Sequence, residues 1–487
     1  MQCSQKEEKK ARKKERASEK EGTTTSLTMT DGTTASAIDL AKEWATNDPN
    51  PITAKYVRDL VAADSTDELA KLFPTDGSRI AFGTAGLRST MMPGPLGMND
   101  LVVVQTAQGL LEYCRKELGS ETPRFVIGYD HRENTHLGLS SKSFAIATAL
   151  VFRQAGADCV LLDGYVHTPL VAFSTTALKA AAGIMVTASH NPKEDAGYKV
   201  YWSDGCQIRP PIDKGIASSI SENLTPWHDY ASLLLLSSSS SSEQQDQDQQ
   251  KDSTQDDCFG LSSPDMTKRM EEEYFLAIQQ SGLIQSVDVS TSPKFVYTAM
   301  HGVGYPYAKR VFDLFGLPPF ESVPSQEQPD AAFPTVSFPN PEEDGALDAA
   351  KALAEKTHDG QNVIVFANDP DADRLAVAEY DCTQDEWTTF TGDQIGVLLG
   401  HWLWERIGKD SDKVSTTVLS HFWWPNGRGL FFFQGSSVPY QSTLLLTTPN
   451  QCIFVSYVGS STARCNVCID RFDENACQDC LDRRLSL

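Results

Sequence analysis

The chain has 487 residues, of which 40% are hydrophobic and 22% charged, an ordinary composition for a soluble globular protein. Its formal net charge of −23 argues against sequence-independent binding to nucleic acid, because such binding depends on neutralising phosphates. No run of about 18 apolar residues is present, so we expect no membrane span, and the N-terminus lacks the apolar segment of a signal peptide. The cysteines of the first 400 residues are scattered without framework spacing, which favours reduced thiols and a cytoplasmic location.

Changes in composition divide the chain, whose length is enough for about three domains. Residues 1–35 are rich in charged residues and then in threonine, and residues 231–262 are mainly Ser, Gln and Asp. Neither segment has enough apolar surface to fold, so we expect a disordered tail and a low-complexity insertion. The remaining divisions that we expect are an α/β domain at 36–230, a second at 263–385, a partial third at 386–420 and a divergent tail at 421–487.

The first domain is predicted to alternate strands and helices. A helix is expected at 99–118, because Asn99 is a suitable N-cap and Gly119 a suitable stop. The elements expected after it are a strand at 125–129, a helix at 138–154, a strand at 158–163, a helix at 169–179 and a strand at 181–186. Such alternation predicts an α/β fold with a mixed, mainly parallel sheet and helices on both faces.

The second domain repeats this alternation. Its expected elements are a strand at 295–298, helices at 305–315 and 343–356, and strands at 362–367 and 375–378. A helix at 394–407 and a strand at 414–419 are expected to begin a third α/β domain, which stays incomplete. We find no sustained helical or strand period in residues 421–487.

Ser189 stands just after the predicted strand 181–186, where Pro192 ends the extended segment. In an open α/β sheet, ligands bind beyond the carboxyl ends of the strands, so a serine at this place is suited to carry a phosphoryl group. The glycines of a nucleophile elbow are missing, and His190 is adjacent in sequence and therefore poorly placed as a triad base. An ordinary turn is the alternative interpretation.

Three carboxylates, Asp369, Asp371 and Asp373, follow the predicted strand 362–367. So much negative charge in a tight loop between two strands is costly unless a cation neutralises it, and carboxylate oxygens suit Mg²⁺. An EF-hand is excluded, since its glycine and glutamate positions would be Arg374 and Tyr380. A solvated acidic turn remains the alternative.

Taken together, the motifs resemble those of the α-D-phosphohexomutases, and most closely the eukaryotic phosphoglucomutase/phosphopentomutase branch. They occur in the family order. The segments that carry the resemblance are 82–88, 127–132, 187–192, 197–202, 297–304, 338–343 and 369–374.

The resemblance implies a Mg²⁺-dependent phosphotransferase. Ser189 is implied to be phosphorylated, and its phosphate would hold Mg²⁺ together with Asp369, Asp371 and Asp373. Phosphoryl transfer to a sugar monophosphate would pass through a bisphosphate and return the other phosphate to the serine. The implied substrates are glucose 1-phosphate, glucose 6-phosphate and pentose phosphates.

Further residues are implied to support that reaction. Lys199 matches the family's general acid/base, a role that requires a lowered pKa. Positive charge for the phosphates is expected from Arg88, His190, Lys199 and Arg374, and close backbone approach from Gly83 and Gly86. Arg132 is expected to support the site rather than to contact substrate.

The resemblance ends at about residue 420, and no fourth domain is recognised. Because the family's sugar-binding and phosphate-binding loops are not found, we expect an impaired mutase. The alternatives are a sugar-phosphate phosphohydrolase and a non-catalytic phosphosugar-binding remnant. Cys465, Cys468, Cys477 and Cys480 form two C-x-x-C pairs that suit zinc, although the gap between the pairs is short. A shifted reading frame or translated intron is the competing interpretation of the tail.

Overall fold

The structure is a computed structural model. It describes residues 35–238, 263–281, 292–407, 431–432, 441–448, 451–458 and 466–471. The chain forms two compact units, one ending at Arg374 and the other beginning at Leu375.

The first unit contains a five-stranded mixed sheet. Its strands, in spatial order, are β1 (Leu87–Thr90), β7 (Asp195–Trp202), β6 (Ala182–Val186), β2 (Arg124–Tyr129) and β5 (Asp158–Leu161). β2 pairs in parallel with both β5 and β6, whereas β7 is antiparallel to β6 and to β1. The predicted α/β class with a mixed sheet is therefore confirmed, but the strand β7 was not among the predicted elements.

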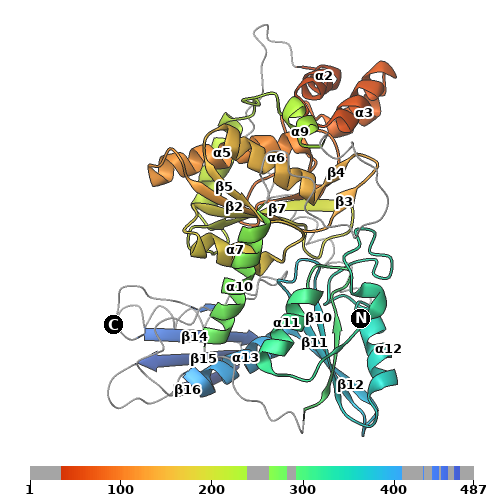
Figure 1. The fold of residues 1–487 in the computed structure, drawn as a ribbon, viewed down its shortest axis with the longest axis vertical. Helices are drawn as coiled ribbons and strands as arrows, with labels where there is room; N and C mark the ends of the chain where they lie inside the picture. Colours follow the sequence, from red (N-terminus) through yellow and green to blue (C-terminus); the bar gives the residue numbers. More distant parts are fainter. Residues whose placement is uncertain are drawn as a thin grey trace. The chain divides into compact units, whose positions relative to one another are not determined.

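Helices cover both faces of this sheet (Figure 1). On one face lie α5 (Asp100–Leu118), α6 (Ser141–Gln154) and α8 (Ile212–Glu222), and on the other lies α7 (Thr168–Ala177), against which α10 (Pro264–Gln280) packs. The side chains of β2 alternate accordingly. Phe125 and Ile127 join the core under α5 and α6, whereas Val126 joins the core under α7, as the two-residue period of a strand requires.

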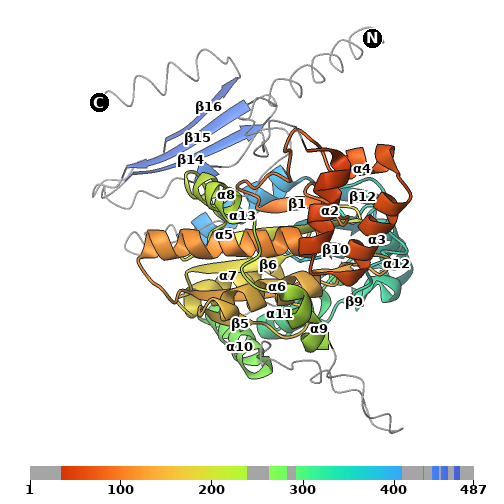
Figure 2. The same cartoon turned by 90° about the horizontal axis from the view of Figure 1, so that it is seen from above.

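Three N-terminal helices that were not predicted pack together (Figure 2): α2 (Ala37–Asn47), α3 (Pro51–Ala62) and α4 (Thr66–Leu72). Local signals explain two of them. Ser36 forms a capping box with Asp39 at the start of α2, and the Asn50 side chain caps α3 before a proline. Trp44, Leu69 and neighbouring apolar residues form their own core.

Several predicted boundaries are confirmed and others are wrong. The helix predicted at 305–315 is α11 (Tyr305–Phe315), and Asn99 caps α5 as expected. The helix predicted from residue 138 begins instead at Ser141, because Gly138 has a left-handed φ of 62° and Ser140 provides the capping box. The helix predicted from residue 343 begins at Asp348 as α12 (Asp348–Thr357).

The part of the first unit that carries the acidic loop has three parallel strands. They are β10 (Val363–Asn368), β8 (Lys294–Thr298) and β9 (Glu321–Ser322), in that spatial order. The buried ring of Phe295 on β8 packs edge-on against Phe312 of α11 and stacks on Phe366 of β10. This packing fixes β10, whose last residue leads directly into the acidic loop.

The second unit contains an antiparallel hairpin of β11 (Leu375–Asp381) and β12 (Glu386–Phe390), followed by α13 (Gly392–Ile407). It also contains an antiparallel sheet of β13 (Phe431–Phe432), β14 (Gln441–Thr448), β15 (Gln451–Val458) and β16 (Asn466–Arg471). The four strands lie in the segment 421–487, where we found no sustained period in the sequence. Their apolar runs are continuous rather than alternating, so they show no period of two.

Some predictions fall outside the described residues. These are the strand at 414–419, nearly all of the tail at 1–35 and the side chains of the four C-terminal cysteines. In the segment predicted as a low-complexity insertion at 231–262, residues 231–238 belong to helix α9 (Tyr230–Ser238), and residues 239–262 are not described.

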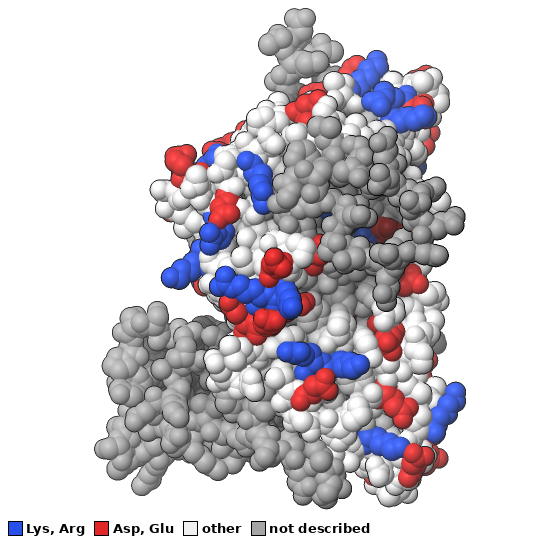
Figure 3. All heavy atoms as spheres, viewed as in Figure 1, with Lys and Arg blue, Asp and Glu red and all other residues white. Residues whose placement is uncertain are grey.

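On the face shown in Figure 3, acidic and basic side chains of the described residues are interspersed, without a large basic patch. No helix in the described part of the chain has the length and apolarity that a bilayer crossing requires.

Candidate active site

Ser189 lies in a tight turn three residues beyond the end of β6. Its N–H donates to Thr187 Oγ1 at 2.8 Å, and Asn191 N–H donates to Ala188 O at 3.0 Å. Ser189 has a left-handed φ of 53°, which is uncommon for a residue other than glycine, and it is only 2% exposed. The turn thus points a buried hydroxyl in a fixed direction.

The acidic loop begins where β10 ends. The Asn368 side chain closes the loop by donating to Arg374 O at 2.5 Å, and it accepts a hydrogen bond from Tyr297 OH at 2.9 Å. Inside the loop, Ala372 N–H donates to Asp369 O, and Arg374 N–H donates to Asp369 Oδ1, both at 2.9 Å. These bonds fix the loop without using all the carboxylate oxygens.

The structure brings the serine and the acidic loop together. Ser189 Oγ donates to Asp369 Oδ2 at 2.6 Å, although 180 positions separate the two residues. One oxygen from each of Asp369, Asp371 and Asp373 lies within 4.8 Å of the others. The first two carboxylates are fully buried, and the third is partly exposed. A hydroxyl and three carboxylates therefore meet at one point.

Asp371 is held from two directions. Lys199 Nζ donates to Asp371 Oδ2 and to Asp373 Oδ2, each at 2.6 Å. Thr168, the first residue of α7, donates from Oγ1 to the same Asp371 oxygen at 2.5 Å and from its N–H to Asp371 O at 3.0 Å. The other oxygen, Asp371 Oδ1, is buried and has no hydrogen-bond partner among the residues that the structure describes.

The charges at this point shift one another's pKa values. Burial and the neighbouring carboxylates of Asp371 and Asp373 raise the pKa of Asp369 well above its usual range. Burial acts to raise the pKa of Asp371 as well, but the Lys199 ammonium and the hydrogen bonds to the carboxylate outweigh it and lower the pKa. Burial acts to lower the pKa of Lys199, and the two carboxylates that it contacts raise it by more.

This result bears on the expected role of Lys199. A general base needs a lowered pKa, whereas here Lys199 is held as an ammonium by Asp371 and Asp373. Lys199 can therefore act as a general acid by giving up a proton. It could act as a base only if another cation replaced its ammonium on the two carboxylates.

His190 also differs from the expectation that it supplies positive charge. Its Nδ1 lies 3.3 Å from Ser189 Oγ. Burial lowers the pKa of His190 to about 3, and the positive charges of Arg374 and Arg88 act in the same direction. The imidazole is therefore neutral at physiological pH in this arrangement, and it is a hydrogen-bonding group rather than a cation.

Arg88 contacts the serine turn, and the two glycines precede Arg88 in the chain. Arg88, on β1, donates from Nη1 to Asn191 Oδ1 at 3.0 Å, and its Nε is buried without a partner. The N–H groups of Gly83 and Gly86 donate to each other's carbonyl oxygens at 3.1 and 2.8 Å. Both N–H groups are therefore already in hydrogen bonds. In this conformation neither can donate to a phosphate, which differs from our expectation.

The carboxylate group fits a hard divalent cation. Its donors are all oxygens, and one of them, Asp371 Oδ1, is buried without a partner among the described residues; burial and the two neighbouring carboxylates also raise the pKa of Asp369. Mg²⁺ prefers such oxygens and keeps positions for phosphate. Among the described residues this is the one group of acidic, histidine or cysteine side chains with metal-binding spacing.

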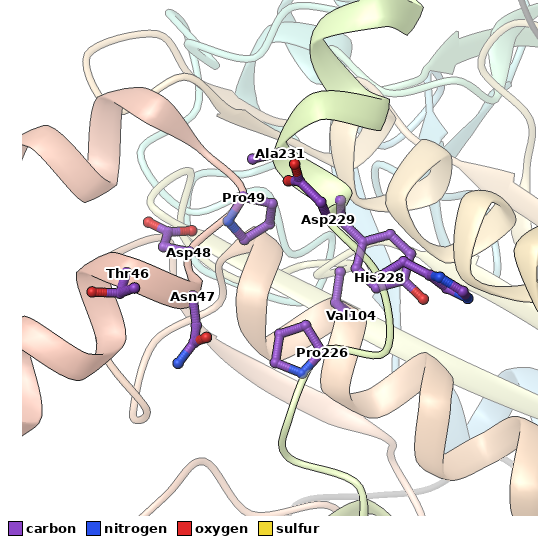
Figure 4. Close-up of a pocket in the computed structure, with 10 residues that line it drawn as sticks. Thr46, Asn47, Asp48, Pro49, Val104, Pro226, His228, Asp229 and Ala231 are labelled. Atoms are coloured by element: carbon purple, nitrogen blue, oxygen red, sulfur yellow. The ribbon is translucent and has the colours of Figure 1, made fainter.

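A separate pocket of about 250 Å³ lies between α2, α5 and the segment before α9 (Figure 4). Its lining residues include Asp48, Pro49, Pro226, His228 and Asp229, none of which belongs to the Ser189 site. The pocket is therefore separate from the Ser189 site, where the serine hydroxyl and the three carboxylates converge.

Comparison with known proteins agrees with the motifs. The family model described as phosphoglucomutase/phosphomannomutase, alpha/beta/alpha domain I, matches residues 79–226, and the corresponding domain II model matches residues 272–381. The chain belongs to the α-D-phosphohexomutase superfamily.

The relatives among curated proteins are phosphosugar enzymes. Human phosphopentomutase is 41% identical over 384 residues, which are 77% of this chain and 58% of the relative. Saccharomyces cerevisiae phosphoribomutase is 41% identical over 380 residues, 76% of this chain and 56% of the relative. Human glucose 1,6-bisphosphate synthase is 37% identical over 389 residues, 78% and 58% respectively. The chain thus spans less than two thirds of the length of each.

A solved structure supports the fold. A crystal structure from Thermus thermophilus, described as that of a phosphomannomutase, has a TM-score of 0.50 and 22% identity, covering 68% of this chain and 62% of its own.

Sequence reasoning missed Thr168. Its signal is local, because Thr168 and Pro169 begin a helix as an N-terminal polar residue and proline often do. Nothing in the sequence relates Thr168 to Asp371, which lies 203 positions later.

Proposed function

We propose that this chain is a Mg²⁺-dependent phosphosugar mutase in which Ser189 carries the phosphoryl group. The observation that supports this most directly is the 2.6 Å hydrogen bond from Ser189 Oγ to Asp369 Oδ2, which joins a buried hydroxyl to a group of carboxylates with metal-binding spacing. Phosphoryl transfer needs alignment and charge neutralisation more than covalent help, and these residues are suited to both.

The reaction that we propose has two balanced transfers. A hydroxyl of the sugar monophosphate takes the phosphoryl group from phosphorylated Ser189 and loses its proton, while the freed Ser189 Oγ gains one, which leaves a bisphosphate. After the bisphosphate reorients, Ser189 Oγ takes its other phosphoryl group and loses its proton, and this loss balances the proton that the released sugar oxygen gains. Mg²⁺ held by Asp369, Asp371 and Asp373 would supply positive charge to the transferring group.

The side chains around Ser189 have distinct proposed tasks. Lys199, held as an ammonium, donates the proton to the departing sugar oxygen. His190 is neutral and hydrogen-bonds the serine oxygen from 3.3 Å. Arg88 and Arg374 bind phosphate oxygens by charge. Gly83 and Gly86 form the turn that precedes Arg88.

The substrate class that we propose is sugar monophosphates, including glucose 1-phosphate, glucose 6-phosphate and pentose phosphates. The names of the relatives, phosphopentomutase and phosphoribomutase, favour the pentose phosphates. We further propose the domain division predicted from composition and a cytoplasmic location, which agrees with the free thiols of Cys114, Cys159 and Cys206.

The test is phosphoryl incorporation at Ser189. The purified chain is incubated with glucose 1,6-bisphosphate and Mg²⁺, and tryptic peptides are analysed by mass spectrometry. We expect one phosphoryl group on Ser189 and none in Ser189→Ala. Ser174→Ala is the matched control, because Ser174 is equally buried on α7 but is not among the residues of this site.

The products separate the alternatives. Isomerised sugar phosphate supports the mutase, whereas release of inorganic phosphate without isomerisation supports a phosphohydrolase. The proposal is contradicted if the wild type takes up no phosphoryl group and Ser189→Ala binds sugar phosphate as well as the wild type does. The chain would then be a non-catalytic binding protein.

A further inference from the structure

The guanidinium of Arg132 is completely buried next to the turn that carries Ser189. It donates four hydrogen bonds to main-chain carbonyl oxygens of that turn and of the residues after it. The acceptors are Ser189 O at 2.6 Å, Asn191 O at 2.7 Å, Pro192 O at 2.7 Å and Asp195 O at 3.1 Å. One side chain therefore holds the whole segment from the serine to the start of β7.

Arg132 is itself held in place. Its N–H donates to Asp130 Oδ1 at 3.2 Å, and its Nε lies 3.5 Å from Asp130 Oδ2. Asp130 also accepts from Ser141 Oγ at 2.6 Å, and Ser141 N–H donates back to Arg132 O at 2.9 Å. The ring of Phe333, from the segment between β9 and α12, covers the guanidinium with its centroid 5.3 Å from Cζ.

The turn needs such support because of its conformation. The left-handed backbone of Ser189 costs about 1 kcal/mol or more in a residue with a side chain, unless neighbouring groups impose it. The planar fork of arginine spreads its donors over two terminal nitrogens and reaches four carbonyl oxygens here, whereas the three donors of lysine share one nitrogen. Arginine at this position is therefore matched to the number and spread of its acceptors.

We propose that Arg132 is a positioning residue for phosphoryl transfer, which fixes the direction of Ser189 Oγ toward the acidic loop. The inference rests on the proposed function. Both terminal nitrogens of Arg132 are used on main-chain oxygens, so the residue acts through the turn and not by contact with substrate. Phe333 assists by excluding water from these hydrogen bonds.

The main experiment compares Arg132→Lys with the wild type in the full chain. We expect the single-turnover rate of phosphoryl transfer between Ser189 and glucose 1,6-bisphosphate to fall about 100-fold, since small misplacements of a reacting atom have effects of this size. The KM for sugar monophosphate should change little, whereas the midpoint of urea unfolding should fall, because the single nitrogen of lysine leaves some of the four buried carbonyl oxygens without a donor. Arg124→Lys is the matched control, because Arg124 makes an exposed ion pair with Asp158 at 2.6 Å on the same unit.

Hydrogen–deuterium exchange provides a readout that is independent of activity. In Arg132→Lys we expect faster amide exchange within residues 187–196 and unchanged exchange in α5 and α6. If Arg132→Lys does not fold, Phe333→Leu carries the test, because it removes the covering ring and keeps all the arginine donors. We expect it to lower the transfer rate and to speed exchange in the same segment, by less than the lysine variant.

Two results would overturn the inference about Arg132, and a third would refute the proposed function alone. A folded Arg132→Lys with the wild-type transfer rate and unchanged exchange overturns the inference. A loss of rate that is matched by an equal loss of substrate affinity, with faster exchange in α5 and α6 as well, shows a merely structural residue and overturns it too. If the wild type takes no phosphoryl group at Ser189, the proposed function is wrong, and exchange alone then decides whether Arg132 holds the turn.

Discussion

Thr168 and Asp371 are joined by two hydrogen bonds, one from the threonine hydroxyl to the carboxylate and one from its N–H to the main-chain oxygen. Because Thr168 is the first residue of α7, the N-terminus of that helix lies against the carboxylate, where its partial positive charge stabilises an anion. The hydroxyl occupies Oδ2 together with Lys199, and this leaves Oδ1 as the oxygen without a partner.

Replacing Thr168 by valine should therefore affect both stability and cation binding. The variant loses a buried hydrogen bond to a charged acceptor, and we expect the free energy of unfolding to fall by about 2 kcal/mol. We also expect Mg²⁺ to bind about 10-fold more weakly, because groups that orient a metal ligand contribute at this scale. Urea unfolding and isothermal titration calorimetry measure the two effects.

Two variants serve as controls for that prediction. Thr168→Ser keeps the hydroxyl and should bind Mg²⁺ nearly as the wild type does. Thr175→Val, on the same helix, removes a hydroxyl that bonds only to Val171 O at 2.8 Å, so it should leave Mg²⁺ affinity unchanged. Equal Mg²⁺ affinity in the Thr168→Val variant and the wild type would show that Thr168 does not orient Asp371.

Replacing Asp369 by asparagine should separate stability from metal binding. In the presence of EDTA we expect the variant to be more stable than the wild type, because Asp369 is buried beside two other carboxylates. Saturating Mg²⁺ at about 100 times its Kd should stabilise the wild type by about 2.7 kcal/mol and the variant by much less.

Thermal unfolding with and without Mg²⁺ measures this difference. Asp204→Asn, which changes an exposed carboxylate paired with Arg209, is the charge-matched control. A variant at Asp369 that Mg²⁺ stabilises as strongly as it does the wild type would remove Asp369 from the metal site.

Asp48 should make stability depend on pH. Burial raises its pKa to about 8, with a further contribution from Asp100. In the unfolded chain an aspartate titrates near pH 4, so between about pH 4 and pH 8 the unfolded state binds fewer protons than the folded state and stability falls as pH rises. Asp48→Asn keeps an acceptor for Thr53 and Asn50 and should make that decline shallower.

Urea unfolding at several pH values in that interval checks the prediction. Asp76→Asn provides the control, since Asp76 is exposed and hydrogen bonds lower its pKa. Identical pH profiles for the Asp48→Asn variant and the wild type would show that Asp48 is ionised in the folded protein.

The two glycines before β1 should respond differently to alanine. Gly86 has a φ of 73°, and a Cβ built there would lie 1.8 Å from Tyr198 O, whereas a Cβ at Gly83 would meet nothing within 4 Å. We expect Gly86→Ala to lower the free energy of unfolding by about 2 kcal/mol or more, and Gly83→Ala to change it by about 0.5 kcal/mol or less. Chemical denaturation of the two variants measures both changes. Equal losses of unfolding free energy would show that the left-handed backbone and the close contact at Gly86 do not require glycine.

Much of the fold was predictable because its signals are local. The cap at Asn99 and the helix of α11 depend on side chains within one turn of the boundary. Gly138 misled the prediction of α6, since a glycine marks the turn before a helix as readily as its beginning. β7 was missed because it is buried on both faces and therefore shows no alternation of apolar and polar residues.

The candidate site was predictable in its members and not in its electrostatics. Ser189 and the three aspartates stand out through their motifs, and the structure brings them together. The neutral state of His190 and the raised pKa of Lys199 come from burial and from partners far away in sequence, which no local pattern contains. The same distance hid Thr168.

Three of the contacts described here join residues 36–230 to residues 263–374: Ser189 with Asp369, Thr168 with Asp371, and Arg132 with Phe333. Substitutions along this seam are expected to lower both turnover and stability, and turnover by more. Screens that rank variants by expression or thermal midpoint would register only part of this effect, so genetic variation at this seam has to be judged by turnover.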